Sequence, residues 1–445
     1  MADIKPFRGI RYDQQVIGDL GLVVCPVYDV IDEAARDAYY NKHPFNVIRL
    51  VLNRPEQGDR DAYEPYRRAG ALWRKWLDQG IVVKDPAPSI YLYRERYILA
   101  GEYKECTGYV ARVRVEDFSK GSILPHEQIM PKPFEDRMRL LEETGANFDM
   151  VHALYSDPEE RLRDRVIAEM ERFPLAQFQT SDGVWHDLWG VSDERFVNRV
   201  SSFLKMRPLY IADGHHRYQT ACEYAERLRQ AGDITDADDP RNFLMMMIVE
   251  MENPGLSVLP VHRVITRPLS CDSEELLKGL AQWFAVDEVD VPRGARSGQV
   301  FLLLKRLEEA GRGGCAFGMF LREPERFLLL TLRSDADLDS EIKGGLSAAY
   351  RGLDVTILHK MVLEKLLCIS QDRASVEKNL AFTRDPMEAV RCVDEGKGSV
   401  VLFTNATKVE QVREVADHGE KMPQKSTYFY PKPWSGVVMN NILEW

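Results

Sequence analysis

The side chains best suited to chemistry gather in one short segment, the run Asp213, Gly214, His215, His216 and Arg217. Leu-Tyr-Ile at 209–211 predicts a short buried strand before this run, and apolar residues at helical spacing over 218–228 predict a helix after it. The polar run is therefore expected at a strand-to-helix corner. Because a helix N-terminus carries backbone N–H groups without intrahelical partners and a partial positive charge, this corner is a candidate phosphate site.

Each residue of the corner has a predicted role and a structural alternative. Gly214 lacks a Cβ that would keep an anion from the backbone, and Arg217 can hold phosphate oxygens in a bidentate fork. His215 and His216 add donors, and Asp213 is a candidate either to hold a metal ion or to orient a histidine. The alternative is that Asp213 caps the helix, Gly214 makes a turn, and the basic side chains are solvated or locally paired.

A second candidate cluster is Pro125-His126-Glu127, which follows an extended stretch and a Lys-Gly turn and is expected in a loop. Its carboxylate is a candidate general base that takes a proton from a hydroxyl nucleophile. Coordination of Mg²⁺ by Glu127, together with Asp213, is the other chemical interpretation. An exposed loop carboxylate beside a surface histidine is the structural alternative.

A third cluster, Lys425, Ser426 and Thr427, carries the side-chain types of phosphate-binding loops. The Gly-x-x-x-x-Gly frame of such loops is missing, so only the ammonium and hydroxyl groups match. We expect these three residues to face the Asp213 to Arg217 corner across one cleft, because a polyphosphate carries more charge than one arginine and a helix terminus neutralise. A folded loop with ordinary turn chemistry is the alternative.

Several other polar residues are interpreted as structural. Asp136 and Arg137 are expected to form an ordinary surface pair on a charged helix. The segment Tyr28-Asp29 and the pair His262-Arg263 are expected to be structural, and the helical His359 is expected to be a packing or a surface residue. No His-Glu-x-x-His or Gly-x-Ser-x-Gly pattern is present, which argues against a zinc peptidase and a serine hydrolase of those types.

Composition narrows the class of protein. The chain has 445 residues, 44% of them hydrophobic and 29% charged, which is typical of a soluble protein with two or three cores. No run approaches 18 apolar residues, and the N-terminus lacks an apolar signal segment, so we expect a cytoplasmic protein without a membrane partner. A net charge of −11 argues against a nucleic-acid partner. The oligomeric state stays open.

The order of expected elements indicates a mixed α/β protein in three regions, 1–115, 116–270 and 271–445. The first is expected to hold extended pieces at 22–24, 47–50, 90–93 and 109–115 and a helix at 62–79. The second is expected to hold helices at 134–143, 158–172 and 194–205, strands at 184–191 and 242–250, and the corner. The third is expected to hold helices at 273–284 and 357–367, a hairpin at 316–332 and a strand at 400–404.

The sequence also resembles known families. The Asp-Gly-His-His-Arg corner before a helix is similar to the nucleotide-phosphate motif of the ParB and sulfiredoxin-like superfamily, which includes chromosome-partition proteins and free-serine kinases. Ordered segments along the chain resemble the bacterial and archaeal family of unknown function DUF1015. They are Pro6-Phe7-Arg8, Pro26-Val27-Tyr28-Asp29-Val30, Asn46-Val47-Ile48-Arg49-Leu50, Pro125-His126-Glu127, Asp136-Arg137, Pro260-Val261-His262-Arg263 and Met422-Pro423-Gln424-Lys425-Ser426-Thr427.

The resemblance implies a ParB/sulfiredoxin-like nucleotide-binding core with additional α/β lobes, the core lying in 116–270. It implies a phosphotransferase that uses ATP or ADP with Mg²⁺ and acts on a small hydroxyl metabolite, of which free serine is the first to test. In this interpretation Arg217, His215 and His216 stabilise charge on the transferred group and Glu127 activates the acceptor. A metal-dependent phosphate-ester or nucleotide hydrolase and a non-enzymatic nucleotide-binding regulator are the alternatives.

Overall fold

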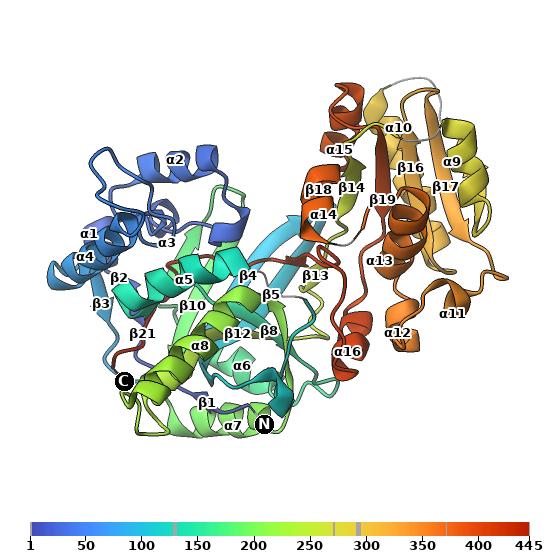
Figure 1. Cartoon of the computed structure of the whole chain (residues 1–445). Coiled ribbons are helices and arrows are strands. Elements are labelled where there is room, and N and C mark those ends of the chain that lie inside the picture. Colours follow the sequence, from blue (N-terminus) through green and yellow to red (C-terminus); the bar gives the residue numbers. More distant parts are fainter. Residues whose placement is uncertain (1, 128–130, 270–271, 291–294, 371, 445) are drawn as a thin grey trace. The chain divides into compact units, whose positions relative to one another are not determined.

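The computed structural model describes residues 2–127, 131–269, 272–290, 295–370 and 372–444 (Figure 1). The chain forms two compact units. The first unit comprises Met1–Pro125, Ile129–Ser257 and Pro431–Trp445, and the second comprises His126–Gln128 and Val258–Tyr430. Each unit has its own sheet and its own core, and the two are described in turn.

The first unit is built on a mixed sheet in which eight strands follow the order β6-β11-β8-β12-β5-β4-β10-β9, with β1 paired to β5. The pairs β11 with β6 and β12 with β8 are parallel, and the others are antiparallel. These strands are β1 (Ile4–Lys5), β4 (Ile90–Leu99), β5 (Glu102–Arg114), β6 (Ile123–Leu124), β8 (Val151–Tyr155), β9 (Ala176–Gln179), β10 (Trp185–Val191), β11 (Leu209–Asp213) and β12 (Phe243–Glu250). Short pairs outside it join β2 (Ile10–Tyr12) to β3 (Val82–Lys84) and β7 (Ala146–Asn147) to β21 (Asn440–Asn441).

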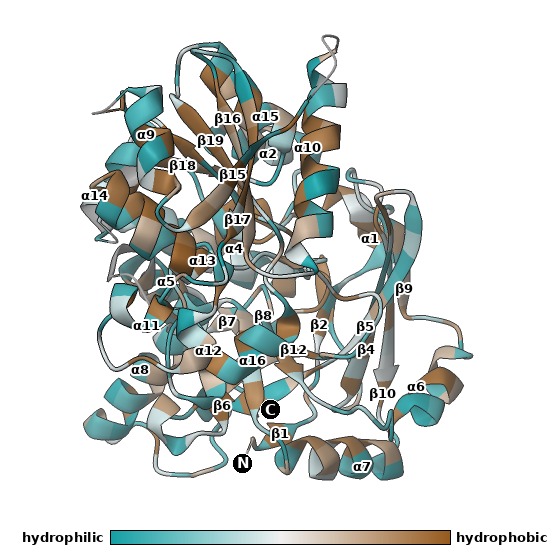
Figure 2. Cartoon of the chain, turned by 90° about the vertical axis from the view of Figure 1, so that its right-hand side faces the viewer, coloured by the Kyte–Doolittle hydropathy of each residue, from teal (hydrophilic) through white to brown (hydrophobic). Residues whose placement is uncertain are grey.

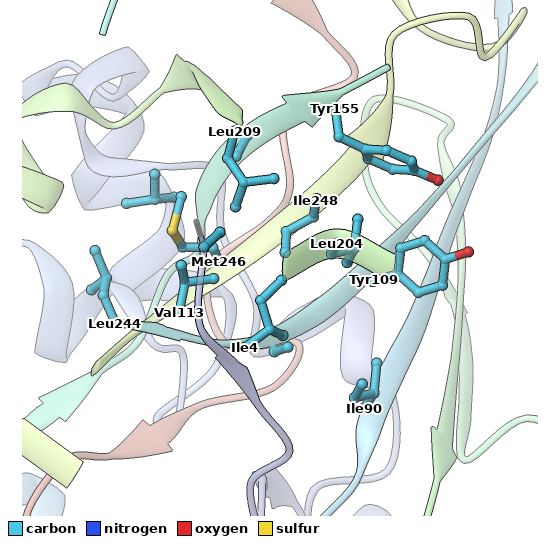
Figure 3. Packing of buried hydrophobic residues seen from close by; sticks show 14 of the residues in the cluster. Ile4, Ile90, Tyr109, Val113, Tyr155, Leu204, Leu209, Leu244, Met246 and Ile248 are labelled. Carbon is cyan, nitrogen blue, oxygen red and sulfur yellow. The ribbon is translucent and has the colours of Figure 1, made fainter. Parts of the chain in front are cut away.

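The central strand β12 explains why this sheet lies in the interior. Seven consecutive residues of β12, Phe243 to Val249, are buried, so both of its faces are covered by protein. An unbroken apolar run is the pattern of such a strand. Figure 3 shows Leu244, Met246 and Ile248 on one face of β12, packed with Val113 of β5 and Leu209 of β11. One core of the first unit is therefore formed on this face of the sheet.

Helices of the first unit connect and cover these strands. The longest, α8 (His215–Ala231), follows β11 directly, lies beside α5 (Pro131–Thr144), and contributes Tyr218, Ala221 and Ala225 to the core (Figure 1). Gly232 ends α8 in the left-handed conformation that favours glycine. The other helices are α1 (Gln14–Ile17), α2 (Glu33–Lys42), α3 (Ile48–Val51), α4 (Glu64–Asp78), α6 (Arg163–Met170) and α7 (Glu194–Lys205).

The second unit has an antiparallel sheet in the order β15-β17-β16-β19-β14-β18. Its strands are β14 (His262–Ile265), β15 (Phe284–Glu288), β16 (Ala316–Leu321), β17 (Arg326–Leu332), β18 (Leu380–Thr383) and β19 (Val400–Thr404). Its helices are α9 (Ser273–Leu280), α10 (Arg296–Gly311), α11 (Leu338–Glu341), α12 (Ala348–Arg351), α13 (Asp354–Ile357), α14 (Arg373–Asn379), α15 (Pro386–Asp394) and α16 (Val409–Asp417), with a π-helical turn over Leu358–Leu366.

Two apolar clusters belong to this second sheet. One joins the sheet to α9 and the π-helical segment, and the other joins it to α10 and α15. Helix α10 buries Val300, Leu303 and Leu307 on the side that packs, and Figure 2 shows it in alternating hydrophobic and hydrophilic bands. An amphipathic helix of this kind covers a sheet with one stripe and meets water with the other.

The mixed α/β class predicted from the sequence is confirmed, but some local predictions are wrong. Residues 47–50, expected to be extended, begin α3, because the buried Asn46 side chain accepts from the Ile48 N–H and donates to the Leu22 and Val24 carbonyls. Residues 22–24 were also expected to be extended, but Leu22 is the last residue of a 3-10 turn over Leu20–Leu22 and Val23 is its C-cap.

The two units cut across the three regions predicted from the sequence. Regions 1–115 and 116–270 share one sheet, because β4 and β5 of the first pair with β10 and β12 of the second. Region 271–445 falls in the second unit except for its last residues, Pro431–Trp445, which belong to the first. Among the helices that the structure describes, none combines the length and apolar character needed to cross a membrane.

Candidate active site

The predicted strand-to-helix corner is present. Strand β11 ends at Asp213, and α8 begins at His215. Gly214 lies between them as the N-cap, with φ of 91°, a value that L side chains rarely adopt. The alternative that Asp213 is the N-cap is therefore wrong. Because glycine has no side chain to cap the helix, the first turn of α8 relies on other partners for its N–H groups.

Arg217 lies in the first turn of α8 and is held by protein acceptors. Its Nη1 donates to Asp149 Oδ1 at 2.8 Å and to the Met150 carbonyl at 2.7 Å, and its Nη2 donates to Asp213 Oδ2 at 2.8 Å. The residue is 8% exposed. Burial alone would lower the pKa of Arg217, but the carboxylates of Asp149 and Asp213 outweigh it and raise this pKa above its ordinary value. The guanidinium is therefore permanently charged and fixed between two carboxylates.

A second cation, Lys432, completes the pairing of Asp213. Its Nζ lies 2.5 Å from Asp213 Oδ1 and 3.7 Å from Asp29 Oδ2. Burial alone would raise the pKa of Asp213, but Lys432 and Arg217 outweigh it and hold that pKa well below its ordinary value. Nearby, burial lowers the pKa of His152 to about 4. Asp213 is therefore ionised, and His152 is neutral, at neutral pH.

The reason for glycine at 214 differs in part from the expected one. A Cβ built on Gly214 would lie 2.9 Å from Nη2 of Arg217, so the arginine side chain itself packs against this backbone position. The positive φ is a second requirement for glycine. Close approach of an anion to Gly214 stays a prediction, whereas close approach of the Arg217 guanidinium is observed.

The charge balance of this cluster bears on its chemistry. Arg217 and Lys432 supply two positive charges, and Asp29, Asp149 and Asp213 supply three negative ones. His215 is buried and His216 is half-buried, both in the first turn of α8. A phosphate would have to contact the helix N-terminus and these histidines, or displace a carboxylate from Arg217. The role of Arg217 as a phosphate clamp therefore stays a prediction.

The predicted Mg²⁺ ligands gain no support from the geometry. The two carboxylate oxygens of Asp213 face an ammonium and a guanidinium, and Glu127 belongs to the other unit. Over the residues that the structure describes, no group of three or more His, Cys, Asp or Glu side chains could hold a metal ion. The described residues therefore do not form a ready metal site.

In the second unit, two clusters predicted from the sequence come together. His126 Nε2 lies 2.9 Å from Thr427 Oγ1, and the Met422 N–H donates to the His126 carbonyl at 2.8 Å. Glu127 forms an isolated parallel bridge with Met422. The Pro125-His126-Glu127 segment and the loop that contains Lys425 to Thr427 are thus neighbours, although about 300 residues separate them in sequence.

The contacts of this loop are those of a folded turn. Ser426 is buried, its hydroxyl donates to the Pro423 carbonyl at 2.5 Å, and its own carbonyl accepts from Thr407 Oγ1 at 2.7 Å. Lys425 has a positive φ of 56°, its side chain is exposed, and its carbonyl accepts from Arg263 Nη2 at 3.1 Å. Because Lys425 lies in the second unit and the corner in the first, a shared phosphate site stays a prediction.

Among the residues interpreted as structural, Arg137 requires a correction. It is buried instead of exposed, pairs with Asp136, donates to the Val51 carbonyl at 3.0 Å, and lies 4.0 Å from the centre of the Tyr28 ring. Its role is to anchor α5 against the N-terminal segment. His262 and His359 are buried, which agrees with packing roles, and burial lowers the pKa of His262 to about 4 and of His359 to about 3.

Sequence reasoning missed Asp149, His152 and Lys432. Asp149 and His152 flank the start of β8, where a carboxylate and a histidine interrupt an otherwise apolar run. Lys432 stands between Pro431 and Pro433, which fix the backbone on either side of it. Its partner Asp213 is 219 residues away, so no local pattern could pair them.

Comparison with solved structures finds distant likenesses. A conserved hypothetical protein from Pyrococcus furiosus has 14% identity and a TM-score of 0.32, over 73% of this chain and 93% of its own. A free serine kinase variant in complex with ADP has 15% identity and a TM-score of 0.35, over 74% of this chain and 91% of its own. The protein SbnI with a C-terminal truncation, from Staphylococcus aureus, has 11% identity and a TM-score of 0.32, over 72% of this chain and 82% of its own. At these values the likeness carries no information about activity.

Comparison with curated proteins finds no match. The family described as "Protein of unknown function (DUF1015)" matches residues 4–356, which include the whole of the Asp213 to Arg217 corner but end before Lys425. This range is well over half of the chain, and it contains the segments singled out in the sequence from Pro6 to Arg263. The chain therefore belongs to the DUF1015 family of proteins of unknown function.

Proposed function

We propose that the protein binds a nucleotide through its phosphates at the N-terminus of α8 and transfers a phosphoryl group to the hydroxyl of a small metabolite. The observation that carries the proposal is the Asp213 to Arg217 corner, where a strand ends, Gly214 adopts a positive φ, and a 17-residue helix begins with His-His-Arg. The dipole of such a helix and the N–H groups of its first turn favour a phosphate there.

The contacts around the corner give its residues distinct roles in this proposal. Arg217 is a positioning residue, because its three hydrogen bonds tie α8 to β11 and to the two residues that precede β8. His216, half-buried in the first turn, is the proposed side-chain donor to an incoming phosphate. Asp213 and Lys432 fix each other beside the helix end.

The proposed reaction is a single displacement at phosphorus. The acceptor oxygen bonds to the terminal phosphorus, the bond from that phosphorus to the bridging oxygen breaks, and the nucleotide leaves with one phosphate fewer. The proton of the acceptor hydroxyl passes to a general base, for which Glu127 is the proposed residue. No step is assigned to a metal ion, because the described residues do not form a site for one.

The test begins with binding and continues with product analysis. The purified chain is heated with ATP, ADP, CTP or GTP, each with and without Mg²⁺, and a bound nucleotide should raise the apparent stability by about 2.7 kcal/mol at a hundredfold excess over its dissociation constant. The nucleotides that bind are then incubated with L-serine and followed by phosphorus NMR. A new phosphate-ester signal supports transfer, free phosphate supports hydrolysis, and binding without either supports a regulatory role.

Variants assign the site. His216→Gln should weaken nucleotide binding, and Glu127→Gln should lower turnover with little effect on binding. The matched control is Arg227→Gln, on the exposed side of α8, where the guanidinium makes a surface pair with Glu223 at 3.0 Å. Nucleotide binding unchanged in His216→Gln and in Gly214→Ala would show that the corner is not the phosphate site.

A further inference from the structure

The second unit contains a pocket of about 220 Å³. Its described lining comes from Tyr350 of α12, His359 of the π-helical segment, Val376 of α14, Phe382 of β18 and the loop 421–424. The volume is below the roughly 300–1,000 Å³ of sites for drug-sized ligands, so the pocket suits a small metabolite. None of these residues belongs to the Asp213 to Arg217 corner, so the inference does not depend on the proposed function.

One wall of the pocket comes from a rare kind of helix. The segment Leu358–Leu366 is π-helical, a geometry that is uncommon and frequently marks functional sites. It carries His359, which is 3% exposed and lines the pocket. Nε2 of this ring is buried and has no hydrogen-bond partner among the residues that the structure describes. Because an unpaired buried polar atom is costly, stability alone does not account for a histidine in this wall.

A buried arginine lies behind the same wall. Arg263 is 1% exposed, and its guanidinium carbon lies 5.7 Å from the centre of the Phe382 ring. Its Nη1 donates to the Val261 carbonyl and its Nη2 to the Lys425 carbonyl, and no carboxylate of the described residues pairs with it. Burial lowers the pKa of Arg263 to about 10, so the guanidinium is charged at neutral pH. This charge reaches the pocket, because it adds to burial in lowering the pKa of His359.

The described lining itself contains one charged side chain, Lys421. Lys421 is exposed, and its ammonium forms no ion pair with any carboxylate that the structure describes. Glu127 meets Met422 through the backbone but does not line the pocket. The pocket therefore combines a lysine at its surface with the positive field of Arg263 from behind, which attracts an anion.

The acids beside the pocket are already engaged. Glu420 and Glu364 add to burial in raising the pKa of Tyr350, so both lie near the pocket, but neither lines it. Glu420 accepts from the Ser347 N–H at 2.7 Å. Glu364 pairs with Lys360 at 2.9 Å. The negative charges near the pocket thus have partners, whereas Arg263 and Lys421 have no carboxylate partner among the described residues.

We propose that this pocket binds a small monocarboxylate that has an apolar body. The carboxylate pairs with the Lys421 ammonium in the field of Arg263. The apolar body packs on Val376, Phe382 and Met422, which supply apolar lining. One lysine matches a single negative charge, and inorganic phosphate would leave the apolar lining without a partner.

The test uses matched probes in calorimetry without nucleotide. The carboxylate probes are 3-phenylpropionate and 4-methylpentanoate, and each is compared with the alcohol and the amine of the same carbon skeleton and with inorganic phosphate. At least one carboxylate should bind saturably, roughly ten times or more as tightly as its alcohol, its amine and phosphate. Absence of saturable binding by both carboxylates overturns the proposal, and so does an alcohol, amine or phosphate that binds as tightly as the carboxylate.

Variants locate the binding. Lys421→Gln, at an exposed position, should weaken carboxylate binding roughly tenfold or more without changing the melting temperature. Arg263→Met should weaken it several-fold, and because it removes a buried charge that has no carboxylate partner, the variant should fold. Lys305→Gln, exposed on α10 and outside the described lining, is the control. Carboxylate binding that is as tight in Lys421→Gln, or in folded Arg263→Met, as in Lys305→Gln overturns the proposal.

Discussion

Replacement of Arg217 by methionine tests whether this arginine is a structural tie. Methionine keeps much of the side-chain length but removes the guanidinium, which leaves the buried Asp149 carboxylate without its ion-pair partner, whereas Asp213 keeps Lys432. Removal of one member of a buried pair typically costs 3–5 kcal/mol, because the other charge stays desolvated. We therefore expect Arg217→Met to lower the free energy of unfolding by about 4 kcal/mol.

The double variant Arg217→Met with Asp149→Asn separates the lost pair from other effects. Neutralising Asp149 removes the uncompensated charge, so at least half of the lost stability should return. The control is Arg227→Met on the same helix, whose surface pair with Glu223 should be worth less than about 1 kcal/mol.

Urea unfolding followed by tryptophan fluorescence is the appropriate assay. It reports mainly on the first unit, because that unit contains Trp73, Trp76, Trp185, Trp189 and Trp434, and Trp283 lies in the second. A loss below about 1 kcal/mol in Arg217→Met, or a double variant no more stable than the single one, would refute the view that Arg217 is a structural tie.

Three further changes have defined outcomes. In urea unfolding, Gly214→Ala should lower the free energy of unfolding by about 1–3 kcal/mol more than Gly183→Ala does. Both glycines have a positive φ, but only a Cβ at position 214 would meet Arg217. Equal losses of free energy in the two variants would contradict this close contact. Burial raises the pKa of Glu95 from about 4.5 to about 8, so the stability that protonated Glu95 contributes is fully present below pH 4.5 and is lost as the pH rises to 8. Relative to Glu95→Gln, the free energy of unfolding of the parent should fall by up to about 1.4 kcal/mol per pH unit in that window. A difference between the two proteins that does not change with pH would show that Glu95 is ionised in the folded chain. Thr427→Val should lower the free energy of unfolding by about 1 kcal/mol, because the contact with His126 is lost. If the two residues are coupled, His126→Ala made in the Thr427→Val protein should lower it further only by the packing that the histidine ring supplies.

Local sequence patterns predicted the elements whose signals are strong. Helix α7 has the predicted bounds, 194–205, because Asp193 caps it and apolar residues recur on one face. Strand β12 and the β11-to-α8 corner also follow the prediction. The prediction of an extended segment at 47–50 was wrong, because the buried Asn46 side chain imposes a turn that the hydrophobic pattern alone does not reveal.

The surroundings of the corner could not be predicted in the same way. The position of Gly214 and the start of α8 are local properties, but the distant partners of Asp213 and Arg217 come from the residues just before β8 and from Lys432 near the end of the chain. Such pairing is decided by the tertiary arrangement of the sheet, which brings β8 beside β11. Sequence therefore located the candidate site and missed what neutralises it.

That neutralisation changes what the corner can do to a phosphate. A phosphate placed at the N-terminus of α8 would find the charges of Arg217 and Lys432 already offset by the carboxylates of Asp213 and Asp149. Two responses are available: the phosphate takes the first-turn N–H groups and His216 while the cluster stays intact, or Arg217 exchanges a carboxylate for a phosphate oxygen. Arg217→Lys distinguishes them, because lysine keeps the charge but loses the fork that spans two acceptors. If the cluster stays intact when phosphate binds, Arg217→Lys should lower the stability of the protein but leave the nucleotide affinity of the folded protein unchanged. If Arg217 exchanges a carboxylate for a phosphate oxygen, Arg217→Lys should lower both the stability and the nucleotide affinity.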